Sequence, residues 1–83
     1  MRRVTKLPLT RREIEILTFA AAGWSNRQIS DEADISHQTV KNHLTTIYDK
    51  MDMPDRTAAC VKGIMDGILD EEKVRKLMKE YVR

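Results

Sequence analysis

The stretch SHQTVKNHLTTIYDKM, residues 36–51, decides the fold of this chain because its residues predict one helix with two different faces. At roughly 100° per residue, a narrow apolar stripe forms from Val40, Leu44, Ile47 and Met51. The opposite side gathers polar residues, which are Gln38, Lys41, Asn42 and Thr45. The apolar stripe predicts a core seam. The polar side carries amides, an ammonium and a hydroxyl, and such groups can address base edges in a DNA major groove.

Two capping boxes predict where the preceding helices begin. Thr10 with Glu13, and Ser25 with Gln28, match a pattern in which side chains satisfy the free amide donors of a helix start. The first helix is expected to end before Gly23, and the second to last about two turns. A turn of a few residues then leads into the helix of residues 36–51. This order is a helix-turn-helix arrangement.

A fourth helix is expected after Asp52 and Pro54, with Asp55 as its cap. Its apolar residues form two stripes. The stripe predicted to face the core contains Ala59, Cys60 and Ile64. A spare face remains beside it, with Ala58, Val61 and Met65, and Ile68 as a further candidate. One small core does not require this much apolar surface, so Ala58, Val61 and Met65 are predicted to form a dimer interface.

The last segment predicts an amphipathic helix that begins after Asp70. Its apolar residues recur at i, i+3, i+4 and i+7, and they are Val74, Leu77, Met78 and Tyr81. A stripe of this kind needs a partner surface. Either the helix folds back over the spare face of the fourth helix, or it leaves that face open to a second copy of the chain.

Composition limits the fold class. Eighty-three residues, 41% hydrophobic and 34% charged, fit one compact domain. The apolar spacing is helical throughout and no alternating pattern predicts a strand, so the expected class is all-α. The expected organisation is a basic N-terminal arm over residues 1–9, a helix-turn-helix domain over residues 10–67 and the C-terminal amphipathic helix over residues 68–83.

The net charge of +2 is too small to indicate nucleic acid alone, but the bases are concentrated at the start of the chain. Residues 1–12 contain no acid, and their bases are Arg2, Arg3, Lys6, Arg11 and Arg12. This arm is either solvated or in contact with phosphates. Neither a signal peptide nor a long apolar span is evident, so we expect a cytoplasmic, nucleoid-associated protein with no membrane partner.

No group of residues in the sequence predicts chemistry. The pattern of a nucleophile with a base and an acid, a glycine-rich phosphate loop and a metal-ligand spacing are all missing, so we expect no enzyme, no metal and no cofactor. Cys60, His43 and Trp24 are expected to pack structurally. Arg56 is expected to bind either the carboxylates of the first helix or a phosphate.

Four motifs in order resemble the DNA-binding domain of the LuxR/NarL/FixJ family of bacterial transcription regulators. They lie in LTRREIEILTFAAAGWSNRQISDEADISHQTVKNHLTTIYDKM, followed by PDRTAA, and cover about residues 9–65. The motifs are the LT-x-RE-x-E-x-L-like opening, G-x-SN-x-x-I, IS-x-x-TVK-x-HL and R-T-x-A. The chain departs from the family at Asp52, where a glycine is usual, and at His37, where a glutamate is common; the fold should survive both.

The resemblance implies a four-helix LuxR-type domain whose third helix enters the major groove and whose fourth helix forms a two-fold dimer contact. The base-reading residues that it implies are Gln38, Lys41, Asn42 and Thr45. The implied phosphate contacts are Ser25, Asn26, Ser36, Thr39 and Lys50. Amide donors at helix starts suit phosphate. In this family the domain usually follows a receiver or ligand-binding domain, so the chain is either a standalone regulator or a piece of a longer one.

The predicted function is therefore a sequence-specific regulator of transcription that binds double-stranded DNA. We expect a homodimer on two half-sites about one helical turn (~34 Å) apart, or a multiple of it, with RNA polymerase as a further candidate partner. One alternative is a polymerase-associated module that resembles region four of a sigma factor. Another is a protein-interaction domain that uses the apolar faces of the last two helices.

Overall fold

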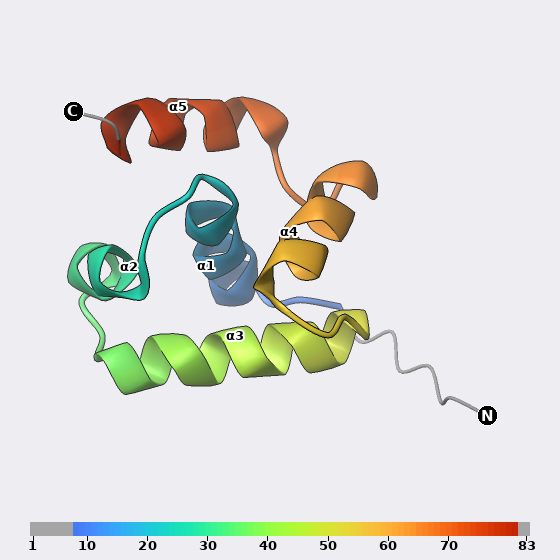
Figure 1. Cartoon of the computed structure of the whole chain (residues 1–83), viewed down its shortest axis with the longest axis horizontal. Coiled ribbons are helices and arrows are strands. Elements are labelled where there is room, and N and C mark those ends of the chain that lie inside the picture. Colours follow the sequence, from blue (N-terminus) through green and yellow to red (C-terminus); the bar gives the residue numbers. More distant parts are fainter. Residues whose placement is uncertain (1–7, 82–83) are drawn as a thin grey trace.

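The structure, a computed structural model, describes residues 8–81 of the chain. Within that range it contains helices and no strand, and the helices are α1 (Arg11–Ala21), α2 (Asn26–Ala33), α3 (His37–Met51), α4 (Arg56–Met65) and α5 (Glu71–Tyr81). The predicted all-α class with a fifth, C-terminal helix is confirmed. Figure 1 shows α3 along one side of the molecule and α5 along the opposite side, with α1 between them. Helix α1 contacts each of the other four.

Local capping fixes the helix starts, as the sequence predicts. The Thr10 hydroxyl accepts from the Glu13 N–H at 3.1 Å, while the Glu13 carboxylate accepts from the Thr10 N–H at 2.8 Å. Ser25 and Gln28 form the same reciprocal box at the start of α2. After α3, Asp52 adopts the left-handed conformation with φ +59°. A short polar side chain tolerates that conformation better than most others, so aspartate can stand where the family usually has glycine.

The apolar stripe of α3 forms the core seam that its periodicity predicts. Val40, Leu44, Ile47 and Met51 are all buried. They pack in the same cluster as Ile16 and Leu17 of α1, which have no exposed surface. Burial of each such side chain stabilises the fold by about 1.5–3 kcal/mol. The packing therefore fixes which side of α3 faces outward.

The predicted core face of α4 is partly wrong. Ala59 is fully buried, and Cys60 is half-buried and packs against the core, but Ile64 is exposed. The buried neighbour of Ala59 is Gly63, four residues on and therefore on the same side of the helix. A Cβ atom at Gly63 would lie 3.1 Å from Leu69 Cγ and 3.3 Å from a methyl group of Leu17. Helix α4 approaches its neighbours through this glycine, and the approach rotates the next residue, Ile64, out of the core.

Helix α5 packs against α1 and leaves the spare face of α4 open. Leu69 and Val74 are each 5% exposed, and the indole N–H of Trp24 donates to the Leu77 carbonyl at 3.0 Å. Trp24 also stacks on Phe19, so its predicted packing role is confirmed. The alternative in which the last helix covers α4 is wrong.

Two further expectations concern residues at the edges of this packing. Ile68 packs against the core instead of joining the spare face of α4. Met78 is half-exposed at the edge of the α5 stripe, while the Tyr81 side chain lies outside the described residues.

None of the helices found between residues 8 and 81 has the length and apolar character needed to cross a membrane.

Candidate nucleic-acid interface

The polar side of α3 is accessible to solvent. Gln38, Lys41, Asn42 and Thr45 are all exposed. In Figure 1 the rest of the described chain lies on one side of α3. The buried stripe on the inner side holds the helix in this orientation, so all four side chains are directed away from the core.

One hydrogen bond organises this polar face. Gln38 Nε2 donates to Asn42 Oδ1 across one helical turn, at 3.1 Å. Lys41 forms no hydrogen bond or ion pair with any described residue, so its ammonium is available to a ligand. Asp49, near the end of the helix, is the first carboxylate of α3. The first three turns therefore present neutral polar groups and one cation.

The starts of α2 and α3 are open to solvent. Ser25 and Ser36, their N-caps, are exposed, and each accepts from the backbone N–H of the third residue of its helix. Thr39 donates its N–H to the Ser36 hydroxyl at 3.1 Å, and the two hydroxyls lie 2.9 Å apart. The positive end of each helix dipole and the remaining free N–H groups suit an anion.

Arg56 has a structural role that differs from both expectations. Its guanidinium donates to the Trp24 carbonyl and, at 2.6 Å, to Asn26 Oδ1. The expected helix-one carboxylates are not its partners in the described part of the chain, because Arg56 opens α4 beside the start of α2. Since Arg56 holds Asn26 Oδ1, the amide nitrogen of Asn26 is turned away from it. Asn26 is half-buried and lies at the expected phosphate position.

Lys50 also has an internal partner. Its ammonium lies 2.8 Å from Glu13 Oε1, with the two side chains 20% and 8% exposed. Burial alone would raise the pKa of Glu13, but the hydrogen bonds from Lys50 and the Thr10 N–H, with the attraction of the Lys50 charge, outweigh it and lower that pKa. A phosphate contact by Lys50 would compete with this ion pair. The pair instead ties the end of α3 to the start of α1.

The basic arm is described only in part. Arg2, Arg3 and Lys6 lie outside the described residues. Arg11 is exposed, whereas Arg12 donates to the Ala33 carbonyl and pairs with Glu15, each at 3.0 Å. Arg12 therefore joins α1 to the end of α2.

The spare face of α4 is an exposed apolar patch. Val61 is 49% and Met65 78% exposed, and Ala58 is half-buried beside them. These three residues line an open depression of about 490 Å³. Large apolar side chains that gather in this way on a small domain mark an interaction surface.

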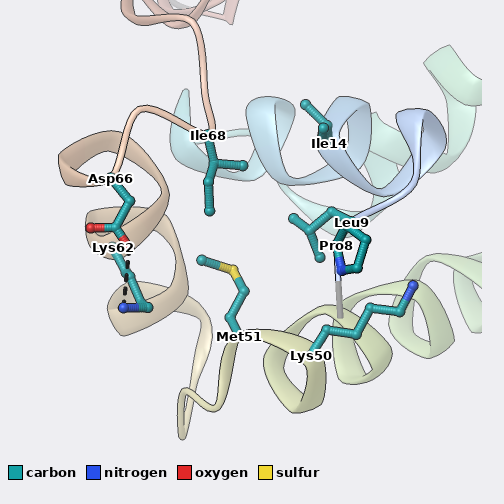
Figure 2. A pocket seen from close by; sticks show the side chains of 8 residues that line it. All are labelled: Pro8, Leu9, Ile14, Lys50, Met51, Lys62, Asp66 and Ile68. Atoms are coloured by element: carbon teal, nitrogen blue, oxygen red, sulfur yellow. Dashed lines mark ion pairs between the residues drawn. The ribbon is translucent and has the colours of Figure 1, made fainter. Parts of the chain in front are cut away.

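A second cavity, of about 400 Å³, lies where the start of α1 meets the ends of α3 and α4 (Figure 2). Apolar side chains surround it, and they are Pro8, Leu9, Ile14, Met51 and Ile68. The charged groups at its rim are paired: Lys62 with Asp66 at 3.1 Å, and Lys50 with Glu13. These groups offer no reactive set.

Neither a metal-ligand cluster nor a reactive cysteine is found among residues 8–81. Across residues 8–81 no three His, Cys, Asp or Glu residues lie close enough to hold a metal ion. Burial raises the pKa of the Cys60 thiol, despite the opposing effect of Arg56, and so favours the protonated and unreactive form.

Comparison with known proteins identifies the family. Residues 7–62 match the family described as bacterial regulatory proteins, luxR family. The chain belongs to this luxR family. A luxR-family domain of this kind is the helix-turn-helix DNA-binding part of a transcription regulator, and the resemblance drawn from the sequence is confirmed.

Individual relatives of this luxR-family chain are longer proteins. It is 49% identical over 59 residues to the transcriptional regulatory protein DegU of Brevibacillus brevis, covering 71% of this chain and 25% of the relative. It is 38% identical over 61 residues to the response regulator protein VraR of Staphylococcus aureus (strain NCTC 8325), covering 74% and 29%. The crystal structure of the response regulator ChrA in a heme-sensing two-component system matches with a TM-score of 0.72 and 39% identity, covering 83% of this chain and 33% of that one. The chain thus spans about a quarter to a third of these proteins.

The family match ends inside α4, so α5 lies beyond the matched residues of this luxR-family chain. The burial of Val74 and the Trp24 bond to Leu77 nevertheless place α5 in the same core. The sequence did not indicate the internal partners of Arg56 and Lys50. Their partners lie 30 and 37 residues away, beyond the reach of any local pattern.

Proposed function

We propose that this luxR-family domain binds double-stranded DNA sequence-specifically by inserting α3 into the major groove. The proposed base contacts are Gln38, Lys41, Asn42 and Thr45. The observation that carries the proposal is the division of α3 into a fully buried apolar stripe and an uncovered polar face. The side chains on that face supply the donors and acceptors that distinguish base pairs in the major groove.

Phosphate contacts at the starts of α2 and α3 would position α3 in the groove. The proposed residues are Ser25, Asn26, Ser36 and Thr39, which lie where helix dipoles and free N–H groups attract an anion. Lys50 is not included because Glu13 holds its ammonium. Contacts of this kind fix the register on DNA but do not read the sequence.

The proposed active form is a homodimer joined through Ala58, Val61 and Met65. This patch is supported by the exposure of Val61 and Met65 and by the position of α5, which leaves it uncovered. Two copies would place two α3 helices on half-sites about 34 Å apart, or a multiple of that distance. Such a regulator would act at the nucleoid in the cytoplasm, with RNA polymerase as a further candidate partner.

Substitution of Lys41→Ala tests the groove contact, and Lys76→Ala is the matched control. Both lysines are exposed, but Lys76 lies on α5, across the molecule from α3. A duplex selected from a random pool and a scrambled duplex are titrated at several salt concentrations. We expect Lys41→Ala to lose about 1–3 kcal/mol of discrimination between the two, and Lys76→Ala to keep it. If Lys41→Ala binds both duplexes as the wild type does, the proposed role of α3 is wrong.

The same titration addresses the two alternative functions. A region-four-like module of a sigma factor would need RNA polymerase for specific binding, whereas the proposed regulator shifts its duplex alone. A protein-interaction domain would not bind random duplex even at low salt. Binding that weakens steeply as salt rises indicates phosphate contacts and excludes that alternative.

A further inference from the structure

The hydrogen bond between Gln38 and Asn42 fixes which atoms these two amides direct outward. The nitrogen and oxygen of a side-chain amide lie on opposite arms of one planar group. Because Gln38 Nε2 donates to Asn42 Oδ1, the free Nδ2 of Asn42 is turned away from Gln38. For the same reason Gln38 Oε1 is turned away from Asn42. The atoms turned outward are an acceptor, Gln38 Oε1, and a donor, Asn42 Nδ2, while Gln38 Nε2 and Asn42 Oδ1 keep one further N–H and one lone pair beside their mutual bond.

We propose that Gln38 and Asn42 read DNA as one coupled unit, with Gln38 as the acceptor and Asn42 as the donor. This inference rests on the proposed insertion of α3 into the major groove. An acceptor there selects a base with an amino group, which is adenine or cytosine, and a donor selects a base with an acceptor, which is guanine, thymine or, through N7, adenine. The half-site would therefore contain an amino-bearing base at the position of Gln38 and an acceptor-bearing base at that of Asn42.

The coupling matters because an amide that rotates freely can present either atom. A free asparagine commonly contacts adenine through both its oxygen and its nitrogen. Here one lone pair of the Asn42 oxygen accepts from Gln38, and both side chains are exposed, so no packed neighbour fixes their rotation. Their mutual hydrogen bond is thus what orients them. Base preference at the position of Asn42 should depend on residue 38.

Substitution of Gln38→Glu reverses the proposed polarity with little change in shape. A glutamate cannot donate, so Asn42 Nδ2 would donate to the carboxylate and its oxygen would turn outward. The preference opposite Asn42 should then move from guanine or thymine toward an amino-bearing base, although Asn42 itself is unaltered. The largest gain should be for cytosine, which offers no acceptor to the wild-type donor. We expect the ratio of affinities at that base pair to shift by about ten-fold or more.

The experiment begins with the duplex that the wild-type chain selects from a random pool. Competition binding to all single base-pair changes of this duplex is measured for the wild type, Gln38→Ala, Gln38→Glu and Asn42→Ala. The base pair at which Asn42→Ala loses discrimination is the one that Asn42 contacts. Lys79→Gln is the control for charge, because it also changes the net charge by one unit and lies on α5. Circular dichroism verifies that each variant is folded.

Two results would support the coupled unit. Gln38→Ala should broaden the preference at the base pair of Asn42, and Gln38→Glu should change it, while Lys79→Gln leaves all ratios as they are. If both Gln38 variants affect other base pairs alone, the two contacts are independent and the inference is overturned. If the wild type selects no sequence, the proposed function and this inference both fail.

Discussion

Substitution of Val74→Ala measures how strongly α5 is joined to the rest of the domain. Val74 is 5% exposed and packs in the same buried cluster as Phe19 and Trp24. Removal of its two methyl groups costs about 0.8 kcal/mol each in transfer from water. A cavity of roughly 50 Å³ adds about 1 kcal/mol. Alanine returns about 0.5 kcal/mol through its higher helix propensity, so the net loss of stability should be about 2 kcal/mol.

Unfolding in urea, followed by fluorescence and by circular dichroism, is the appropriate assay. Trp24 is the one tryptophan of the chain and is bonded to α5, so its emission reports on this junction. We expect both signals to change together, with a loss of about 2 kcal/mol for Val74→Ala. In a domain of this size that loss lowers the melting temperature by about 8–16 °C. The control Lys76→Ala, exposed on the same helix, should unfold as the wild type does.

The reasoning would be refuted by either of two results. One is a Val74→Ala variant with the wild-type urea midpoint, which would mean that α5 contributes nothing to the fold. The other is a wild-type chain in which the Trp24 emission changes well before the helical signal, since α5 would then unfold separately from α1–α4.

Three further predictions follow from other contacts of the described chain. Because the folded-state pKa of Glu13 is lowered, its charge stabilises the fold above its ordinary pKa of 4.5, and this stabilisation is lost as the pH falls through the folded-state value. The stability difference between the wild type and Glu13→Gln should therefore be constant near neutral pH and shrink below about pH 4, as measured by urea midpoints; a pH-independent difference would argue against the pair with Lys50. Gly63→Val should destabilise the fold by about 1–3 kcal/mol or more through overpacking against Leu69, and an unchanged midpoint would contradict that close approach. Val61→Asp should abolish the dimer in light scattering and weaken binding to a duplex with two half-sites more than to one with a single half-site; equal effects on both duplexes would remove α4 from the interface.

The sequence predicts the parts of this fold that depend on local signals. The reciprocal box of Thr10 and Glu13 lies within one turn, so residue types at fixed spacing suffice to locate the start of α1. The buried stripe of α3 likewise follows from periodicity. The polar face is then fixed by elimination, because a helix with one buried side must direct the other outward. The bond between Gln38 and Asn42 also had a local signal, since residues four apart are neighbours on a helix.

The errors come from interactions between distant segments. A hydrophobicity pattern assigns Gly63 no role, yet its missing side chain sets how closely α4 approaches Leu17 and Leu69, and this rotates Ile64 outward. The family resemblance implies a phosphate contact for Lys50, and its ion pair with Glu13 could not be foreseen because Glu13 lies 37 residues away in the sequence. Arg56 was expected to bind either the carboxylates of the first helix or a phosphate, and its actual acceptors could not be identified before the packing of α4 beside α2 was known.

The contacts of Arg56 connect the proposed dimer patch to the proposed DNA face. Arg56 opens α4, the helix that carries Val61 and Met65, and it binds both the Trp24 carbonyl and the Asn26 side chain at the start of α2. Helix α2 packs against α3, so α4 is joined to α3 directly and also through α2. A dimer formed on α4 would therefore fix the relative orientation of two α3 helices through packed elements rather than a flexible linker. Such a dimer should have a strict requirement for half-site spacing, and an arginine far from the bases would help to set it.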